Sequence, residues 1–193
     1  MSIIIVSRKN PKSLEVAMRK MLPGEKVFVA DVTSKSSSPD WVVFSPFHSY
    51  ATAEGTPHFQ VPGSAEKSFT VEGAWQGLKV FEGESVDKSK FTVRNGKNLK
   101  RTSRAKGRGK VLGHAFDNVL LDYVAARKQI YLPLYNQQLD HPAAQTSLHK
   151  LVQALQENDH LILLDYETNE DVQNTRTPLS HASLVKRRLL EMV

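Results

Sequence analysis

The stretch from residue 70 to residue 81 has the sequence Thr70-Val71-Glu72-Gly73-Ala74-Trp75-Gln76-Gly77-Leu78-Lys79-Val80-Phe81. Its spacing predicts a helix with two different faces. One face is apolar and consists of Val71, Ala74, Leu78 and Phe81. The opposite face carries a carboxylate, an indole, an amide and an ammonium group, from Glu72, Trp75, Gln76 and Lys79. We therefore expect the apolar face in the core and the polar face on one wall of a pocket.

The start and the glycines of this stretch add further expectations. Thr70 suits the N-cap position, and Glu72 then lies in the first turn, where the helix dipole favours a negative charge. Gly73 and Gly77 each cost about 1 kcal/mol relative to alanine in a helix, so another segment should approach the backbone closely there. The same pattern also allows a solvent-exposed face with a charge pair between Glu72 and Lys79.

Composition bounds the class of protein. The chain has 193 residues, of which 40% are hydrophobic, and it carries a net charge of +6 without any cysteine. This length fits one domain with a real core. Without cysteine, disulfides, thiol nucleophiles and Cys-ligated zinc are excluded. No apolar segment approaches the roughly 18 residues of a membrane span and the N-terminus lacks a signal-peptide h-region, so we expect a soluble, cytoplasmic protein.

Apolar runs and turn residues predict the other elements of the chain. Strands are expected at residues 3–6, 26–31, 41–44 and 161–165. Helices are expected from Pro11 to the Pro23-Gly24 pair, within 115–139 with a break or kink at Pro133, at 142–156, and from the N-cap Ser180 to Leu190. Residues 49–69 form a long loop in this scheme. The predicted class is α+β: a mostly helical single domain, residues 1–193, with a small sheet.

Residues 97–110 are densely basic and include no acidic residue. The cations are Lys97, Lys100, Arg101, Arg104, Lys106, Arg108 and Lys110. Two interpretations stay open: a solvated loop, or an element that holds the phosphates of a diphosphate or a nucleic-acid backbone. The run is not a Walker A loop, because no strand precedes it and no Ser or Thr follows its last lysine. The seven histidines show no metal-binding spacing, so we expect neither a metal nor another cofactor.

A second polar segment, residues 165–171, follows the predicted strand at 161–165. Its acidic residues are Asp165, Glu167, Glu170 and Asp171. Carboxylates at the end of a strand are well placed for chemistry, although a plain polar loop after an edge strand would have the same sequence.

These segments together resemble the NADAR superfamily (NAD- and ADP-ribose-associated), which includes N-glycosidases acting on phosphorylated riboflavin-pathway intermediates. Phe44-Ser45-Pro46-Phe47 is similar to that family's FSNF motif, with Pro46 where Asn is usual. Within residues 71–79, three positions match its SEHYFQAQK helix, namely Glu72, Gln76 and Lys79. Gly73 stands where the family has His.

The rest of the resemblance is looser. Residues 105–109 resemble the family's A-x-x-L-G-R segment, and residues 165–171 resemble its acidic strand end. Residues 179–190 are similar to its closing N-x-L-G-x-L-L-M helix, with His181 near the family's Asn. The likeness covers residues 40–193, which we expect to form a NADAR-like core. Residues 1–35 have no counterpart and would be a strand-helix-strand extension.

The resemblance implies an N-glycosidase or ADP-ribosyl hydrolase. Such an enzyme cleaves the bond between ribose C1 and nitrogen in a nucleotide-like or ADP-ribosylated substrate, guanine in DNA included. Cleavage develops positive charge on the sugar, which a fixed carboxylate stabilises. Glu72 is the first candidate for that carboxylate, and Asp171 is the second. Lys79 would protonate the leaving nitrogen or attack C1 and hold the sugar as a Schiff base.

The expected substrate is a nucleotide or ADP-ribose-type small molecule, or nucleic acid, and no membrane is involved. Trp75 and Phe47 would stack on a ring, while Arg104, Lys106 and Arg108 would hold phosphate. The full set of expected substrate-binding residues is Phe44, Ser45, Phe47, Trp75, Gln76, Arg104, Lys106, Arg108 and His181. The alternative function is a non-catalytic module that binds NAD, ADP-ribose or nucleic acid. A third option is an interaction protein whose charged helix faces water.

Overall fold

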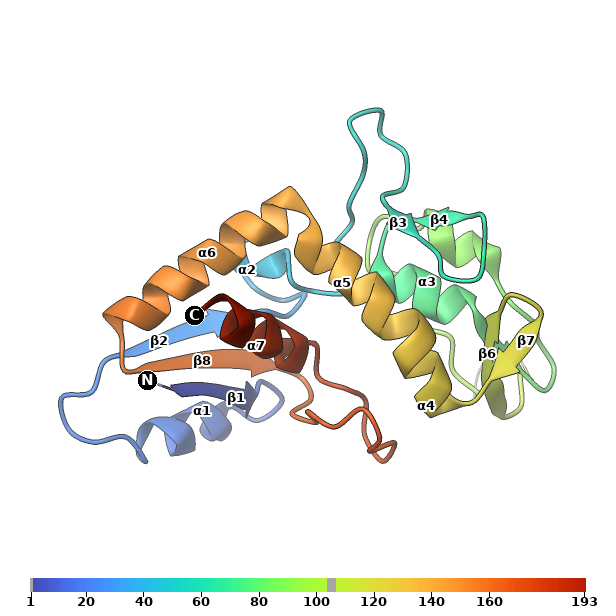
Figure 1. Cartoon of the computed structure of the whole chain (residues 1–193). Helices are drawn as coiled ribbons and strands as arrows, with labels where there is room; N and C mark the ends of the chain where they lie inside the picture. Colours follow the sequence, from blue (N-terminus) through green and yellow to red (C-terminus); the bar gives the residue numbers. More distant parts are fainter. Residues whose placement is uncertain (1, 104–106) are drawn as a thin grey trace. The chain divides into compact units, whose positions relative to one another are not determined.

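The computed structural model describes residues 2–103 and 107–193 (Figure 1). It confirms the predicted α+β class. The chain divides into two compact units. Unit 1 comprises Met1–Ser45 and Leu139–Val193, and unit 2 comprises Pro46–Gln138. These limits differ from the division between an extension at 1–35 and a core at 40–193 that the sequence suggested.

A parallel sheet forms the centre of unit 1. Its strands are β1 (Ser2–Ser7), β8 (His160–Asp165) and β2 (Val27–Asp31), in the order β1-β8-β2. Ser2 and Val27 both pair with His160 at the start of the sheet. The central strand is a run of buried aliphatic residues, as is usual for a parallel strand covered on both faces. Residues 1–35 therefore supply both outer strands of this sheet.

Most predicted elements of unit 1 are confirmed, and one is wrong. Strands β1, β2 and β8 and helix α6 (Pro142–Glu157) lie where expected. Residues 41–44 are not a strand, because helix α2 (Pro39–Val42) includes the first two of them and a turn follows. The reason is a set of helix-start signals: Ser38 accepts a hydrogen bond from the Asp40 amide, and Pro39 fits the first turn. These signals outweigh the short apolar run that follows.

Two more helices complete unit 1. Helix α1 (Pro11–Met18) begins at Pro11 as predicted, with Asn10 as its N-cap, and lies beside β1 (Figure 1), but it ends at Met18, well before the Pro23-Gly24 pair. Helix α7 (His181–Met192) follows the predicted N-cap Ser180 and packs with α6, β8 and β1. Among the helices in the described part of the chain, none is long and apolar enough to cross a membrane.

Unit 2 is built around helix α3 (Val71–Gly77) and two small antiparallel sheets. One sheet pairs β3 (Phe59–Gln60) with β4 (Lys67–Ser68), inside the segment expected to be a long loop. The other sheet has the order β5-β6-β7. Its strands are β5 (Lys79–Phe81), β6 (Val111–Phe116) and β7 (Val119–Leu121), and a 3-10 helix, η1 (Lys88–Thr92), packs on α3.

The helix expected within 115–139 is wrong in its first part, where β6 and β7 form a hairpin. Asp117 and Asn118 connect Phe116 to its partner Val119, and Asp117 adopts a φ of 54°. Asp and Asn tolerate this backbone region, which tight hairpin turns require. The turn signal was present, but the apolar spacing around it imitated a helix.

The remainder of that segment is helical. It consists of α4 (Tyr123–Ala126), a π-helical turn η2 (Arg127–Tyr131) and α5 (Leu132–Asp140). The π turn ends two residues before Pro133. Proline has no N–H group and its ring crowds the preceding turn, so the wider turn lets the chain remain helical past it. The helix thus continues through the proline, so the predicted break is wrong.

Candidate active site

Helix α3 starts as expected but is shorter and more buried. Thr70 is its N-cap, with the side-chain oxygen accepting a hydrogen bond of 2.8 Å from the Gly73 amide. Every residue from Val71 to Gly77 is buried, so the alternative of a solvent-exposed polar face is wrong, and the apolar face lies in the core as expected. Lys79 lies on β5, because the chain after Leu78 pairs with β6 instead of continuing the helix.

The close backbone approach expected at the two glycines is confirmed. A Cβ atom at Gly73 would lie 2.6 Å from the carbonyl oxygen of Lys90, and one at Gly77 would collide with the Phe91 ring. Both contacts come from η1, which packs directly on the backbone of α3. The glycines therefore serve the packing of two helices within unit 2.

A chain of hydrogen bonds links two of the predicted catalytic residues. Gln76 Nε2 donates to Glu72 Oε1 over 2.8 Å, and Lys79 Nζ donates to Gln76 Oε1 over 2.9 Å. Glu72 is only 8% exposed, and Lys79 is partly buried. One amide group thus connects a buried carboxylate to an ammonium group. We call Glu72, Gln76 and Lys79 the relay.

Burial lowers the pKa of the Lys79 ammonium, because desolvation penalises its charged form. The Glu72 carboxylate opposes this by raising the pKa, whereas the charges of Arg101 and Lys100 lower it further. A lysine with a lowered pKa has a larger share of free amine near neutral pH. A lysine nucleophile requires the free amine. The lowered pKa also makes the ammonium a stronger acid.

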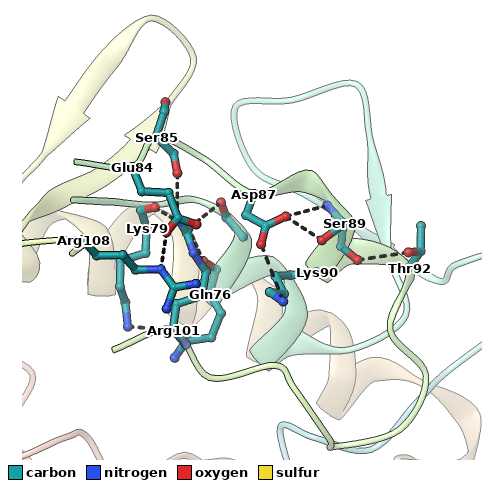
Figure 2. A network of polar contacts seen from close by, with 11 residues as sticks. Gln76, Lys79, Glu84, Ser85, Asp87, Ser89, Lys90, Thr92, Arg101 and Arg108 are labelled. Carbon is teal, nitrogen blue, oxygen red and sulfur yellow. Dashed lines mark hydrogen bonds and ion pairs between the residues drawn. The ribbon is translucent and has the colours of Figure 1, made fainter. Parts of the chain in front are cut away.

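Arg101 fixes the surroundings of the relay (Figure 2). It is 2% exposed, and its backbone N–H donates to Gln76 Oε1 over 2.9 Å. Its guanidinium donates to the carbonyl oxygens of Gln76, Lys79 and Ser85 over 3.0, 2.6 and 2.6 Å, and to the Glu84 carboxylate over 3.0 Å. Arg101 therefore ties the end of α3 to β5 and to the following loop, a role that its place in the basic run did not reveal.

The basic run is only partly open to solvent. Arg108 Nε pairs with the same Glu84 carboxylate that Arg101 contacts (Figure 2). The hydrogen bond from Arg108 is the main reason that the pKa of Glu84 is lowered, and Arg101 adds to it. Lys97, Lys100 and Lys110 are exposed. Two residues predicted to bind phosphate, Arg104 and Lys106, lie outside the described residues.

An aromatic group covers one side of α3. The Trp75 ring stacks on the His114 ring at 3.8 Å and 28°, and the Tyr131 ring meets Trp75 edge-on at 5.6 Å. One face of Trp75 is thus already in contact with a protein ring. His114 lies opposite Lys79 in the pairing of β5 with β6. Adjacent strands hold such partners side by side on one face of the sheet.

His114 is a residue that the sequence analysis missed. It is fully buried, and neither ring nitrogen has a hydrogen-bond partner among the described residues. Burial lowers the pKa of His114 to about 3, with smaller contributions from the charges of Lys79 and Arg101. Burial along β6 does not alternate, because Val111 and Leu112 are both exposed whereas Gly113 and His114 are both buried, so no periodic signal in the sequence marked His114.

The segment resembling the FSNF motif is divided between the units. Phe44 and Ser45 are buried residues of unit 1, and Phe47 is a partly buried residue of unit 2. Within unit 2, the carbonyl oxygen of Pro46 accepts a 2.8 Å hydrogen bond from the Glu72 amide. Lys100 Nζ lies 5.6 Å from the centre of the Phe47 ring. Phe47 is therefore tied to the start of α3 through its neighbour.

Asp171 and His181 both belong to unit 1. Asp171 is exposed, and its carboxylate accepts a hydrogen bond of 2.8 Å from the Gln173 amide, which shapes a turn. His181 Nε2 lies 2.9 Å from the carbonyl oxygen of Val32, and Nδ1 lies 3.1 Å from the Asp165 carboxylate. Both ring nitrogens of His181 are thus engaged in joining α7 to the ends of β2 and β8.

The buried carboxylate of this segment is Asp165, which is 2% exposed. It accepts hydrogen bonds from the Ser180 hydroxyl over 2.6 Å and from the Ala182 amide over 3.1 Å. A negative charge is favourable at this end of a helix. The acidic strand end predicted for chemistry thus contains one residue, Asp165, that anchors the start of α7.

The geometry defines an α+β protein with a buried relay of carboxylate, amide and amine in unit 2. The chain belongs to a family of unknown function, DUF6939, which matches residues 9–185. A comparison with curated proteins finds no match.

Proposed function

We propose that the relay belongs to an N-glycosidase or ADP-ribosyl hydrolase that cleaves a bond between ribose C1 and nitrogen. The observation that carries the proposal is the chain of hydrogen bonds from the buried Glu72 through Gln76 to Lys79, whose pKa is lowered by burial. The resemblance of residues 44–47 and 71–79 to the NADAR superfamily supports the choice of reaction. A cytoplasmic location is part of the proposal, and the cysteine-free sequence is consistent with it.

Each residue of the relay has a role in the proposed reaction. The C1–nitrogen bond breaks, and its electron pair leaves with the nitrogen, so positive charge develops on the sugar. The Glu72 carboxylate stabilises that charge in a site from which water is largely excluded. In the first route, Lys79 gives a proton to the leaving nitrogen, and water adds to C1 and loses a proton. The products are the free base and the sugar with a hydroxyl group at C1.

In the second route, Lys79 acts as the nucleophile. Its neutral amine attacks C1, the nitrogen leaves with a proton from solvent, and the opened sugar is held as a Schiff base until water releases it. The lowered pKa of Lys79 favours this route, because only the free amine attacks. Gln76 orients the amine in both routes by accepting a hydrogen bond from it.

The test is release of free base from ADP-ribosylated guanine DNA, from ribosylated pyrimidines and from phosphorylated flavin precursors. We expect one of these substrates to be cleaved by the wild type and not by Lys79→Ala. Lys88→Ala is the matched control, because Lys88 is a surface lysine of unit 2 that pairs with Glu66. Borohydride should trap a sugar on the wild type only if Lys79 is the nucleophile. Cleavage that survives in Lys79→Ala would remove Lys79 from the mechanism.

A binding module is the second candidate function. The exposed Lys97, Lys100 and Lys110 favour it, because exposed lysines attract phosphate groups without requiring the relay. In that case ADP-ribose or nucleic acid would bind equally to the wild type, Glu72→Gln and Lys79→Ala, and no base would be released.

A further inference from the structure

The hairpin formed by β6 and β7 in unit 2 carries a cluster of exposed apolar side chains (Figure 1). Of the nine large apolar residues that are exposed in the described part of the chain, four lie on this hairpin. They are Val111, Leu112, Val119 and Leu120, at 46%, 50%, 59% and 50% exposure. Single exposed apolar residues are ordinary, whereas a cluster of them on one element often marks an interaction surface.

Strand β7 is an edge of the sheet β5-β6-β7, and the backbone of Leu120 points outward from that edge. Ala115, the partner of Leu120 on β6, donates its N–H to the carbonyl oxygen of Leu78 over 2.8 Å. Since the N–H of Ala115 points towards β5, Ala115 and Leu120 form an antiparallel pair that exchanges no hydrogen bonds. The N–H and C=O groups of Leu120 are therefore directed away from β6, where another strand can reach them.

The opposite edge of the same sheet is closed. The carbonyl oxygen of Lys79 accepts the 2.6 Å hydrogen bond from the Arg101 guanidinium, and the Phe81 N–H donates to the carbonyl oxygen of Glu84 over 2.8 Å. Proteins usually protect an edge with charges, proline or a covering segment, because its free N–H and C=O groups pair readily with another strand. β7 consists of three aliphatic residues without a charge or a proline, so its short length is what limits pairing.

A second copy of the chain supplies a strand that fits this edge. An antiparallel strand must meet the outward groups of Leu120, and two-fold symmetry then places Leu120 opposite its own copy. In that register Val119 lies opposite Leu121 of the second copy, and the same contact forms again on the other side of the axis. Every side chain that meets within the two strands is thus aliphatic.

The charges beside β7 agree with this register. The nearest carboxylates are those of Asp117 and Asp122, and both residues are exposed. The register places Asp122 opposite Asn118 of the second copy and Asp117 opposite Tyr123, so no two carboxylates meet. Asp122 Oδ1 accepts a hydrogen bond from the Ala125 amide, and the carboxylate keeps a second oxygen that can accept one from the Asn118 side chain of the second copy.

We propose that two copies of the chain associate by antiparallel pairing of their β7 strands, with the two-fold axis at Leu120. The pairing joins two three-stranded sheets into one sheet of six strands and covers the exposed side chains of Val119 and Leu120. Because β7 is short, the interface is small and the association depends on protein concentration. It is independent of the proposed reaction, since neither Glu72 nor Lys79 takes part in it.

Sedimentation velocity of the full chain over a series of concentrations tests the proposal. The wild type should change from monomer to dimer as the concentration rises. Leu120→Glu should weaken this association at least about tenfold, because two leucine contacts are lost and two like charges meet at the axis. Leu120→Lys should act in the same way. A mixture of the two variants should associate again, since a glutamate then faces a lysine, and this recovery would exclude misfolding as the cause.

Leu112→Glu is the matched control. Leu112 is also 50% exposed, but it lies on β6, which is the central strand of the sheet. The variant adds the same charge to the same hairpin and should leave the association unchanged.

An introduced cysteine locates the axis. The chain contains no cysteine, so a single thiol reports on its own position. In a hydrogen-bonded antiparallel pair the two Cα atoms are about 5.5 Å apart, a separation that suits a disulfide. Leu120→Cys should therefore form a covalent dimer under mild oxidation much faster than Leu112→Cys.

Four outcomes would overturn the proposal. The first is a wild type that stays monomeric at every concentration, and the second is a mixture of the two Leu120 variants that fails to associate. The third is an equal loss of association in Leu120→Glu and Leu112→Glu, which would assign the contact to the exposed apolar face instead of the β7 edge. The fourth is equal rates of disulfide formation in the two cysteine variants.

Discussion

Replacing Glu72 with glutamine is the sharpest perturbation of the relay. The change keeps the length of the side chain and an oxygen that can accept the hydrogen bond from Gln76, but it removes the negative charge. Glu72 is 8% exposed, so its charge is poorly screened by water. We therefore expect kcat for the ribosyl–nitrogen substrate to fall about 10²-fold to 10³-fold, the scale for loss of one electrostatic stabiliser. Binding should change far less, because the ground-state sugar carries little positive charge.

The same variant makes a second prediction that does not depend on turnover. The Glu72 charge raises the pKa of Lys79, so its removal should lower that pKa below the wild-type value. Competitive acetylation followed by peptide mass spectrometry measures the pH at which Lys79 is half-reactive. We expect this pH to be lower in Glu72→Gln than in the wild type.

Glu66→Gln is the control, because Glu66 is a carboxylate of the same unit that pairs with Lys88 at the surface. It should leave both turnover and the reactivity of Lys79 unchanged. Equal losses of turnover in the two variants would refute the argument, as would an unchanged titration of Lys79 in Glu72→Gln.

Three predictions concern stability, measured as the free energy of unfolding in urea. Arg101→Met should lower the free energy of unfolding by about 3–5 kcal/mol, because the carbonyl groups and the carboxylate around the buried guanidinium lose their donor. The control Lys97→Met, at an exposed position, should change that free energy by less than about 0.5 kcal/mol. Gly77→Ala should cost about 1–3 kcal/mol, because its Cβ overlaps the Phe91 ring, and an unchanged midpoint would show that η1 moves away freely. The pKa of His114 is about 3 in the folded state against 6.5 ordinarily, so the unfolded chain binds more protons between these values. Stability from His114 is therefore complete above pH 6.5 and falls by up to about 1.4 kcal/mol per pH unit as the pH drops towards 3. His114→Phe should flatten this dependence between pH 6.5 and 4.5, and an unchanged slope would contradict the assignment.

Local signals in the sequence determined most elements whose stabilising contacts are close in the chain. Asn10, Thr70 and Ser180 mark helix starts because an N-cap acts through amides two or three residues away, or through the backbone turn itself. The aliphatic runs at the start of the chain and at 161–165 are typical of strands, which predicted β1 and β8, although only β8 is largely buried. The close packing at Gly73 and Gly77 was also predictable, because glycine in a helix has a cost that only a close neighbour explains.

The wrong elements are those for which two local patterns competed or a distant partner decided. Trp41 and its neighbours suited a strand, but the cap three residues earlier started a helix. Lys79 suited a helical face. It is part of a strand instead, because it pairs with His114, which lies 35 residues further along the chain. Pairing between two strands depends on a segment that is too far along the chain to belong to any local sequence pattern.

For the candidate site, the sequence alone determined which chemical groups recur at helical spacing: Glu72 and Gln76 are four residues apart, and they meet on one turn. Only the tertiary structure decided what surrounds them. It brought Lys79 to Gln76 from a strand, buried Arg101 against the end of α3, and placed His114 on Trp75. Burial and electrostatic coupling are properties of segments that are far apart in the chain, so the lowered pKa of Lys79 followed from the fold and not from the motif.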